Sequence, residues 1–208
     1  MSNKTQLEIR SLPEVPVAGD NRVISGYAIV FGVESRVLCD WEGEFIEVIE
    51  QGAVDDSLIE RCDIKALFNH NHNQLLARRY YGEGSLQLSV DSHGLRFEFV
   101  APETTLGNDI LELVRRGDLR GCSFAFVADA ENIEYKRRGE DRLRTVKRLS
   151  SLHDISIVVD PAYTQTSVDV RAFEDSERKD AKPCGLSPEL AQLRATLRRE
   201  IDLSNTNL

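Results

Sequence analysis

The sequence contains no apolar run approaching the roughly 18 residues that a membrane-spanning helix needs. Its first ten residues, MSNKTQLEIR, lack the apolar middle of a secretory signal peptide. We therefore expect a protein that works in a cytosol, away from membranes. With 208 residues, 41% hydrophobic and 29% charged, the chain has the composition of one globular domain with some tail.

Paired cysteines are also missing. The four cysteines, Cys39, Cys62, Cys122 and Cys184, lie far apart and form no CxxC pair. This spacing indicates neither a zinc knuckle nor a disulfide framework, so we expect free thiols. Excess basic charge is missing as well: the 35 acidic residues outnumber the 26 lysines and arginines, and a net charge of -9 argues against a nucleic-acid-binding surface. The basic segment 135–148 mixes both signs around a glycine, which predicts a solvated hairpin or mobile loop.

What the sequence does contain is a series of short β-branched or aromatic runs separated by turn residues, which predicts an α+β fold. Apolar residues at helical spacing predict two helices, within 52–62 and 104–117. The segment 71–73, NHN, is expected to leave the sheet. The predicted strands are 22–32, 36–49 with a break at 42–44, 64–70, a hairpin over 85–102 that turns at 91–94, 143–149 and 152–159.

The composition changes after Phe173. Residues 174–185 are mostly polar and helix-breaking, as in a linker. A helix is then predicted from Ser187-Pro188, with one apolar face formed by Leu186, Leu190, Leu193, Leu197 and Ile201. We expect a domain over 1–173 and a tail over 174–208, in which the helix either docks on the domain or binds a partner as a detachable segment.

Histidines provide two possible kinds of site. His70 and His72 alternate on one segment and would point the same way, as two ligands of a zinc ion do. No carboxylate cluster or cysteine stands at ligand spacing from them, so we expect no metal and no cofactor, and a metal-dependent hydrolase remains the weaker alternative. His93 lies in the predicted turn at 91–94 and is expected to be exposed.

Nucleophilic catalysis needs a serine or cysteine, a base, and a group that orients the base. His70 ends an apolar strand, Ser123 follows the glycine-rich approach RRGDLRGC, and Asp154 interrupts an apolar strand. The alternative without catalysis is that His70 and Ser123 are polar residues at strand ends and that Asp154 is a half-exposed carboxylate. Strand alternation places Cys122 on the core face with two phenylalanines and Ser123 on the other face. A cysteine nucleophile at Cys122 remains an alternative.

Five blocks of the sequence occur in an order that resembles a known family. They are Asn-His at the end of a strand, a GLxFE hairpin, a helix ending in Arg-Arg-Gly-Asp, a GxSFxF strand, and an ISIV strand followed by Pro-Ala-Tyr. Over residues 7–171 they resemble the tailed-phage prohead maturation proteases, procapsid serine proteases related to the herpesvirus assemblins. The resemblance implies a compact, mostly antiparallel β-barrel flanked by helices.

The same resemblance implies the site. His70 would be the base, Ser123 the nucleophile and Asp154 the third member, with His153 as the alternative third member because the assemblins use a histidine there. Backbone N–H groups near Ser123 would hold the oxyanion. Arg144 or Arg148 would be the nearest basic residues to assist the oxyanion or the substrate.

The implied function is a serine endopeptidase that cleaves scaffold proteins, capsid precursor proteins and itself during phage prohead maturation. Its partners would be the major capsid protein precursor or the scaffolding protein, and it would form a homo-oligomer if it follows the assemblins. It would act in the host cytoplasm, packaged inside the immature prohead. The alternative function is a non-enzymatic internal scaffold protein with a protease-like fold.

Overall fold

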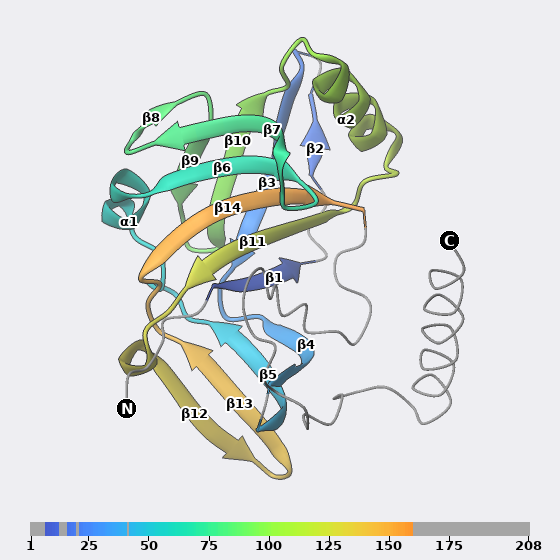
Figure 1. Cartoon of the computed structure of the whole chain (residues 1–208). Coiled ribbons are helices and arrows are strands. Elements are labelled where there is room, and N and C mark those ends of the chain that lie inside the picture. Colours follow the sequence, from blue (N-terminus) through green and yellow to red (C-terminus); the bar gives the residue numbers. More distant parts are fainter. Residues whose placement is uncertain (1–6, 13–15, 20, 41, 160–208) are drawn as a thin grey trace, which may run out of the picture.

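The computed structural model describes residues 7–12, 16–19, 21–40 and 42–159, which form three β-sheets and two α-helices (Figure 1). The predicted tail over 174–208 lies outside the described residues. The first sheet has six strands in the order β1-β11-β14-β6-β7-β8. Their bounds are β1 Glu8–Leu12, β11 Gly121–Val127, β14 Ser151–Val158, β6 Asp63–Phe68, β7 Asn71–Tyr80 and β8 Glu83–Gly84.

The other two sheets have four strands each, in the orders β2-β3-β10-β9 and β12-β13-β5-β4. Two of the strand pairs, β14 with β6 and β13 with β5, are parallel, and the other pairs are antiparallel. The bounds are β2 Val17–Ala18, β3 Val23–Val30, β10 Gly94–Val100, β9 Gln87–Val90, β12 Ile133–Arg138, β13 Asp141–Val146, β5 Gly43–Ile49 and β4 Glu34–Asp40.

The predicted α+β class and the mostly antiparallel pairing are confirmed. The pairings among the described residues leave each sheet open, so they do not form the closed barrel that the family resemblance implied. Within the part of the chain that the structure describes, no helix is long and apolar enough to cross a membrane.

The core lies where the six-stranded sheet packs on the β2-β3-β10-β9 sheet, behind it in Figure 1. β10 contributes Phe97 and Phe99, and β11 contributes Phe124 and Phe126, all at most 2% exposed. Burying aromatic side chains supplies much of the free energy of folding, at about 25 cal/mol per Å² of apolar surface. This packing fixes β11, and β11 carries Ser123.

Helix α2 (Thr105–Arg116) leads directly into β11. Thr104 caps its first turn by accepting a hydrogen bond from the Gly107 N–H at 3.1 Å. Gly117 ends it in the left-handed conformation, with φ 74°, which costs a glycine little. The other α-helix, α1 (Asp56–Arg61), and the short 3-10 helix η1 (Ala130–Asn132) connect strands. Both predicted α-helices and the predicted hairpin of β9 and β10 are therefore confirmed.

Two sequence expectations are wrong. The NHN segment does not leave the sheet, because the chain turns back after β6 and Asn71 begins β7. The cysteines are not all outside disulfides, because Cys39 is disulfide-bonded, whereas Cys62 and Cys122 are buried and form no disulfide. The basic segment 135–148 is the hairpin of β12 and β13, one of its two predicted forms.

Candidate active site

Ser123 lies in the middle of β11, a strand that is paired on both sides. Ser11 of β1 is its register partner on one side and Ser156 of β14 on the other. The side chains of Cys122 and Phe124 join the core, as alternation predicts. The opposite face of β11 is covered too, since Ser123 is 0% exposed. A buried hydroxyl needs hydrogen-bond partners, and those partners define the site.

His70 reaches Ser123 because β6 and β7 are joined by a turn of only two residues. Asn69 and His70 both have positive φ, at 50° and 55°, the sign that a two-residue type I′ hairpin turn requires. Asparagine and histidine tolerate this region better than most residues. The Asn69 N–H donates to the Ile157 carbonyl at 3.0 Å, which fixes the turn against β14. Backbone strain of this kind is often found at functional sites.

Three side chains from three strands or turns form one hydrogen-bonded chain. His70 Nδ1 lies 2.6 Å from Asp154 Oδ1, and His70 Nε2 lies 2.6 Å from Ser123 Oγ. The His70 side chain is 19% exposed and that of Asp154 6% exposed. The Asp154 side chain reaches His70 because β14 lies next to β6 and brings the carboxylate to the turn.

Asp154 determines which tautomer of His70 is stable. A carboxylate only accepts hydrogen bonds, so the 2.6 Å contact requires a proton on Nδ1. Nε2 then presents its lone pair to the Ser123 hydroxyl. A base aimed at a hydroxyl and held by a carboxylate is the arrangement that activates a serine for attack on a carbonyl.

Ser156 is a site residue that the sequence reasoning missed. Its hydroxyl donates to Asp154 Oδ1 at 2.9 Å, accepts the His70 backbone N–H at 3.1 Å, and lies 3.3 Å from His70 Nδ1. The signal was present in the sequence, because residues 154 and 156 alternate on one strand and point to the same face. Ser156 thus holds both the carboxylate and the turn that carries the imidazole.

Strand β1 adds two contacts that the sequence reasoning also missed. The Ser11 hydroxyl donates to Ser123 Oγ at 3.0 Å, and the Arg10 carbonyl lies 2.8 Å from Ser123 Oγ, within reach of its proton. No sequence pattern links positions 112 residues apart, so these contacts follow only from the pairing of β1 with β11. Because β11 pairs on both sides, its backbone N–H groups lie in the ladders and not at an open oxyanion site.

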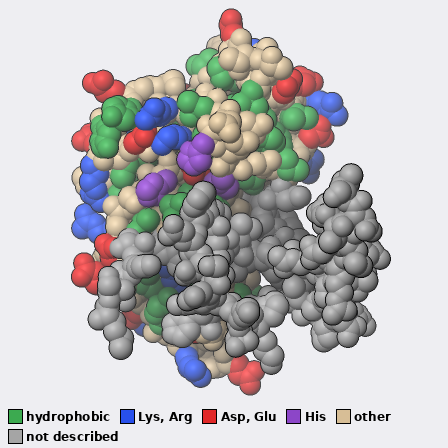
Figure 2. All heavy atoms as spheres, in the orientation of Figure 1, with side chains coloured by type: hydrophobic (Ala, Val, Ile, Leu, Met, Phe, Trp, Pro, Cys, Tyr) green, Lys and Arg blue, Asp and Glu red, His purple; other side chains and the backbone are tan. Residues whose placement is uncertain are grey.

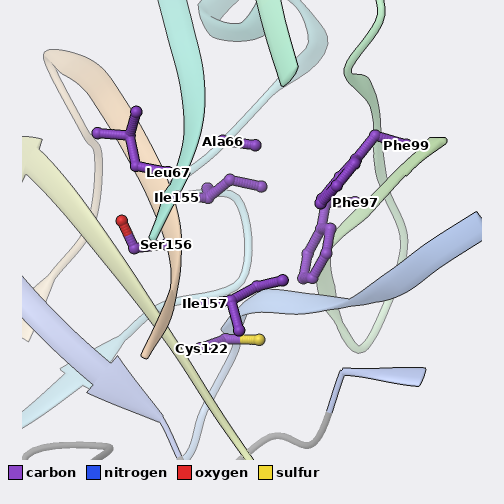
Figure 3. Close-up of a pocket in the computed structure, with 8 residues that line it drawn as sticks. All are labelled: Ala66, Leu67, Phe97, Phe99, Cys122, Ile155, Ser156 and Ile157. Carbon is purple, nitrogen blue, oxygen red and sulfur yellow. The ribbon is translucent and has the colours of Figure 1, made fainter. Parts of the chain in front are cut away.

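Cys122 points away from this chain of hydrogen bonds. It lines a cavity of about 10 Å³ in the core, together with side chains such as Phe97, Phe99 and Ile157 (Figure 3). Ser156, whose hydroxyl donates to Asp154, also lines this cavity (Figure 3). The structure does not bring Cys122 together with His70.

The other two candidate histidines do not join the site. His153 is the extra residue of a β-bulge in β14, exposed, with Nε2 2.9 Å from Ser151 Oγ. Partial burial of its ring lowers the pKa of His153, partly offset by the charge of Asp154. His72 is exposed on β7, and both ring nitrogens of His70 face Asp154 and Ser123. Figure 2 shows histidine side chains gathered near the middle of one face.

Among the described residues, no group of three or more His, Cys, Asp or Glu side chains is arranged to hold a metal ion. The two expected arginines also lie elsewhere. Arg144 pairs with Glu8 and Glu47 in a buried cluster, and Arg148 pairs with Asp55 at 3.0 Å on the surface. Neither arginine forms a hydrogen bond or ion pair with Ser123, His70 or Asp154. His93 is exposed in the β9–β10 turn, as predicted.

A serine hydroxyl, an imidazole and a carboxylate joined in one hydrogen-bonded chain are the arrangement typical of serine hydrolases. A comparison with protein families then matches residues 5–180 of the chain to the caudovirus prohead serine proteases. The match covers most of the 208 residues, and the chain belongs to this family. It is therefore a serine endopeptidase of capsid maturation. No curated protein and no solved structure matches it significantly.

Proposed function

We propose that the protein uses Ser123 as nucleophile, His70 as general base and Asp154 as the orienting carboxylate of a peptide-cleaving site. The observation that carries this proposal is the continuous chain of two 2.6 Å contacts, from Ser123 Oγ through His70 to Asp154 Oδ1. Family membership adds that the chemistry is peptide hydrolysis.

The proposed reaction has two stages. Ser123 Oγ attacks the substrate carbonyl carbon while its proton moves to His70 Nε2, and Asp154 stabilises the charged imidazole. His70 then gives the proton to the leaving amine, which leaves an acyl-enzyme on Ser123. Water attacks this ester with His70 again as base, and the proton returns to Ser123 Oγ as the acid product leaves.

The proposed substrates are the scaffolding protein, the major capsid protein precursor and the protease itself, cleaved inside the immature prohead in the host cytoplasm. A protease packaged with its substrates meets them at high concentration. The family description names a prohead protease, which supports proteins of the immature shell as substrates in general.

Replacing Ser123 by alanine tests this function. We expect Ser123→Ala to reduce precursor cleavage by about 10⁵-fold or more, because the nucleophile is lost while the fold is kept. The measurement is gel analysis of precursor and product in proheads assembled with wild-type or variant protease. Cys122→Ala is the matched control and should leave cleavage intact.

The outcomes separate the alternatives. Cleavage that persists in Ser123→Ala and stops in Cys122→Ala would move the nucleophile to the cysteine. Cleavage by neither wild type nor variant, with normal shell assembly, would favour the non-enzymatic scaffold. Loss of cleavage with a chelator would favour the metal-dependent hydrolase.

A further inference from the structure

We propose that Ser11 is a further catalytic residue of this site, whose hydroxyl stabilises the oxygen of Ser123 as it loses its proton. The proposal rests on the proposed function, because it assumes that Ser123 is the nucleophile. Its starting observation is the hydrogen bond that Ser11 Oγ donates to Ser123 Oγ at 3.0 Å.

The strand register places the two hydroxyls together. Ser11 and Ser123 are direct partners in the antiparallel pair of β1 and β11, so their side chains project from the same face of the sheet. Partners in such a pair have Cβ atoms about 5 Å apart, a separation that two short serine side chains can bridge. Ser11 is half-buried, whereas Ser123 is 0% exposed.

Strand β1 is also held in place by ion pairs with strands β5 and β13. As an edge strand it has a single ladder, with β11. Arg10 places its guanidinium against the carboxylate of Glu47 from β5, with contacts of 2.6 and 3.0 Å. Glu8 binds Arg144 of β13 through two 2.6 Å contacts, and Arg144 also binds Glu47. Breaking a buried ion pair is costly, so this cluster keeps β1 in register.

The carboxylates of this cluster stabilise its arginines. Burial by itself would lower the pKa of Arg10, but the Glu47 and Glu8 carboxylates together raise that pKa above its usual value. Glu47 is 2% exposed and Arg144 4% exposed, so the cluster is nearly closed to solvent. The position of Ser11 is therefore fixed by the β1–β11 ladder and by the charged cluster that holds the same strand.

The hydrogen bond donated by Ser11 assists the step in which Ser123 loses its proton. When the O–H bond of Ser123 breaks, the proton goes to His70 Nε2 and the electron pair of Oγ forms the bond to the substrate carbonyl carbon. Negative charge builds on Oγ before that bond is complete, and a hydrogen bond donated to the charged form favours it. In deacylation Oγ leaves from the carbonyl carbon and takes the proton back from His70, so the same donor assists the second stage.

The other contact from β1 cannot serve this purpose. The Arg10 carbonyl, 2.8 Å from Ser123 Oγ, only accepts hydrogen bonds and competes with His70 Nε2 for the single hydroxyl proton. The backbone N–H groups of β11 are engaged with its two neighbouring strands. Among the described residues that contact Ser123 Oγ, Ser11 is the one whose hydroxyl donates to this oxygen.

The test is the rate at which a fluorophosphonate probe bonds covalently to Ser123 in the full-length protein. We expect Ser11→Ala to slow labelling about tenfold or more, the effect of losing one hydrogen bond to a charged group. Ser11→Thr keeps the hydroxyl and should label at close to the wild-type rate. Ser25→Ala, a half-buried serine on β3, is the matched control and should label normally.

Thermal unfolding of each variant separates a catalytic role from a structural one. If Ser11→Ala unfolds at a lower temperature than the wild type, Ser11→Cys takes its place in the test. The thiol keeps the size of the side chain but is a weaker donor, so Ser11→Cys should label at an intermediate rate. Labelling of Ser11→Ala at the wild-type rate or faster overturns the role of Ser11 and leaves Ser123 as nucleophile. Absence of labelling at Ser123 in the wild type overturns the proposed function, and the role of Ser11 with it.

Discussion

The Asp154 carboxylate determines which nitrogen of His70 carries the proton. It lies 2.6 Å from Nδ1 and also accepts the Ser156 hydroxyl at 2.9 Å. Two donors on one buried oxygen fix its position. At this scale the site depends on a single tautomer, and Asp154 is the residue that selects it.

Replacing Asp154 by asparagine tests this dependence. Asp154→Asn keeps the size of the side chain but can turn its NH₂ group towards Nδ1, which would place the proton on Nε2 and block proton transfer from Ser123. We expect kcat to fall by on the order of 10³–10⁴ with little change in KM. Steady-state hydrolysis of a precursor-derived peptide measures it.

His153 provides the control for that experiment. It is exposed and contacts Ser151, so His153→Asn should keep close to wild-type activity. Loss of activity in His153→Asn with retained activity in Asp154→Asn would identify His153 as the third member of the site.

At the scale of the strand pair, β6 and β7 carry the His70 turn, and a surface charge cluster joins them at their far end. Asp63 of β6 contacts Arg78 of β7 at 2.6 and 2.7 Å and Lys65 at 2.9 Å. The Arg78 hydrogen bonds are the main cause that lowers the pKa of Asp63 to about 2. Burial opposes them, and Lys65 lowers this pKa further.

The cluster predicts a pH dependence of stability. Because the folded-state pKa of Asp63 lies below the ordinary value of about 3.9, its contribution is complete above about pH 4 and is lost as the pH falls through about 2. Exposed pairs contribute little, so Asp63→Asn should lower the free energy of unfolding by less than about 1 kcal/mol at pH 7. Denaturant unfolding at pH 7 and at about pH 2 measures it, and an equal loss at both pH values would contradict the assignment.

Strands and helices with strong patterns were predicted well from the sequence. The alternation in β9 and β10 and the helical spacing in α2 are local signals, and the structure has these elements where they were expected. The turn at Asn69 and His70 was missed because two-residue hairpin turns usually carry glycine, and an Asn-His pair gives no such signal.

The residues of the candidate site were also predicted only in part. His70, Ser123 and Asp154 were named through the family resemblance, and the structure places them in contact. The roles of Ser11 and Ser156 depend on the order β1-β11-β14-β6 of the six-stranded sheet. That order is set by contacts between residues far apart in the sequence, which no local pattern encodes.

For the whole molecule, the tail over 174–208 lies outside the described residues and its role stays a prediction. We expect the linker and the leucine-faced helix to attach the protease to scaffold until maturation. A chain truncated after Phe173 should then enter proheads less efficiently than the full-length chain. Counting protease copies in purified proheads measures this, and unchanged packaging would contradict it.

The central claim is that one serine, activated by His70, does the chemistry of the whole molecule. It is tested most directly by treating the full-length protein with a fluorophosphonate probe and locating the adduct by peptide mass spectrometry. We predict a single adduct on Ser123, retained in Cys122→Ala and lost in both Ser123→Ala and His70→Ala. An adduct on Cys122, or undiminished labelling of Ser123 in His70→Ala, would contradict the account.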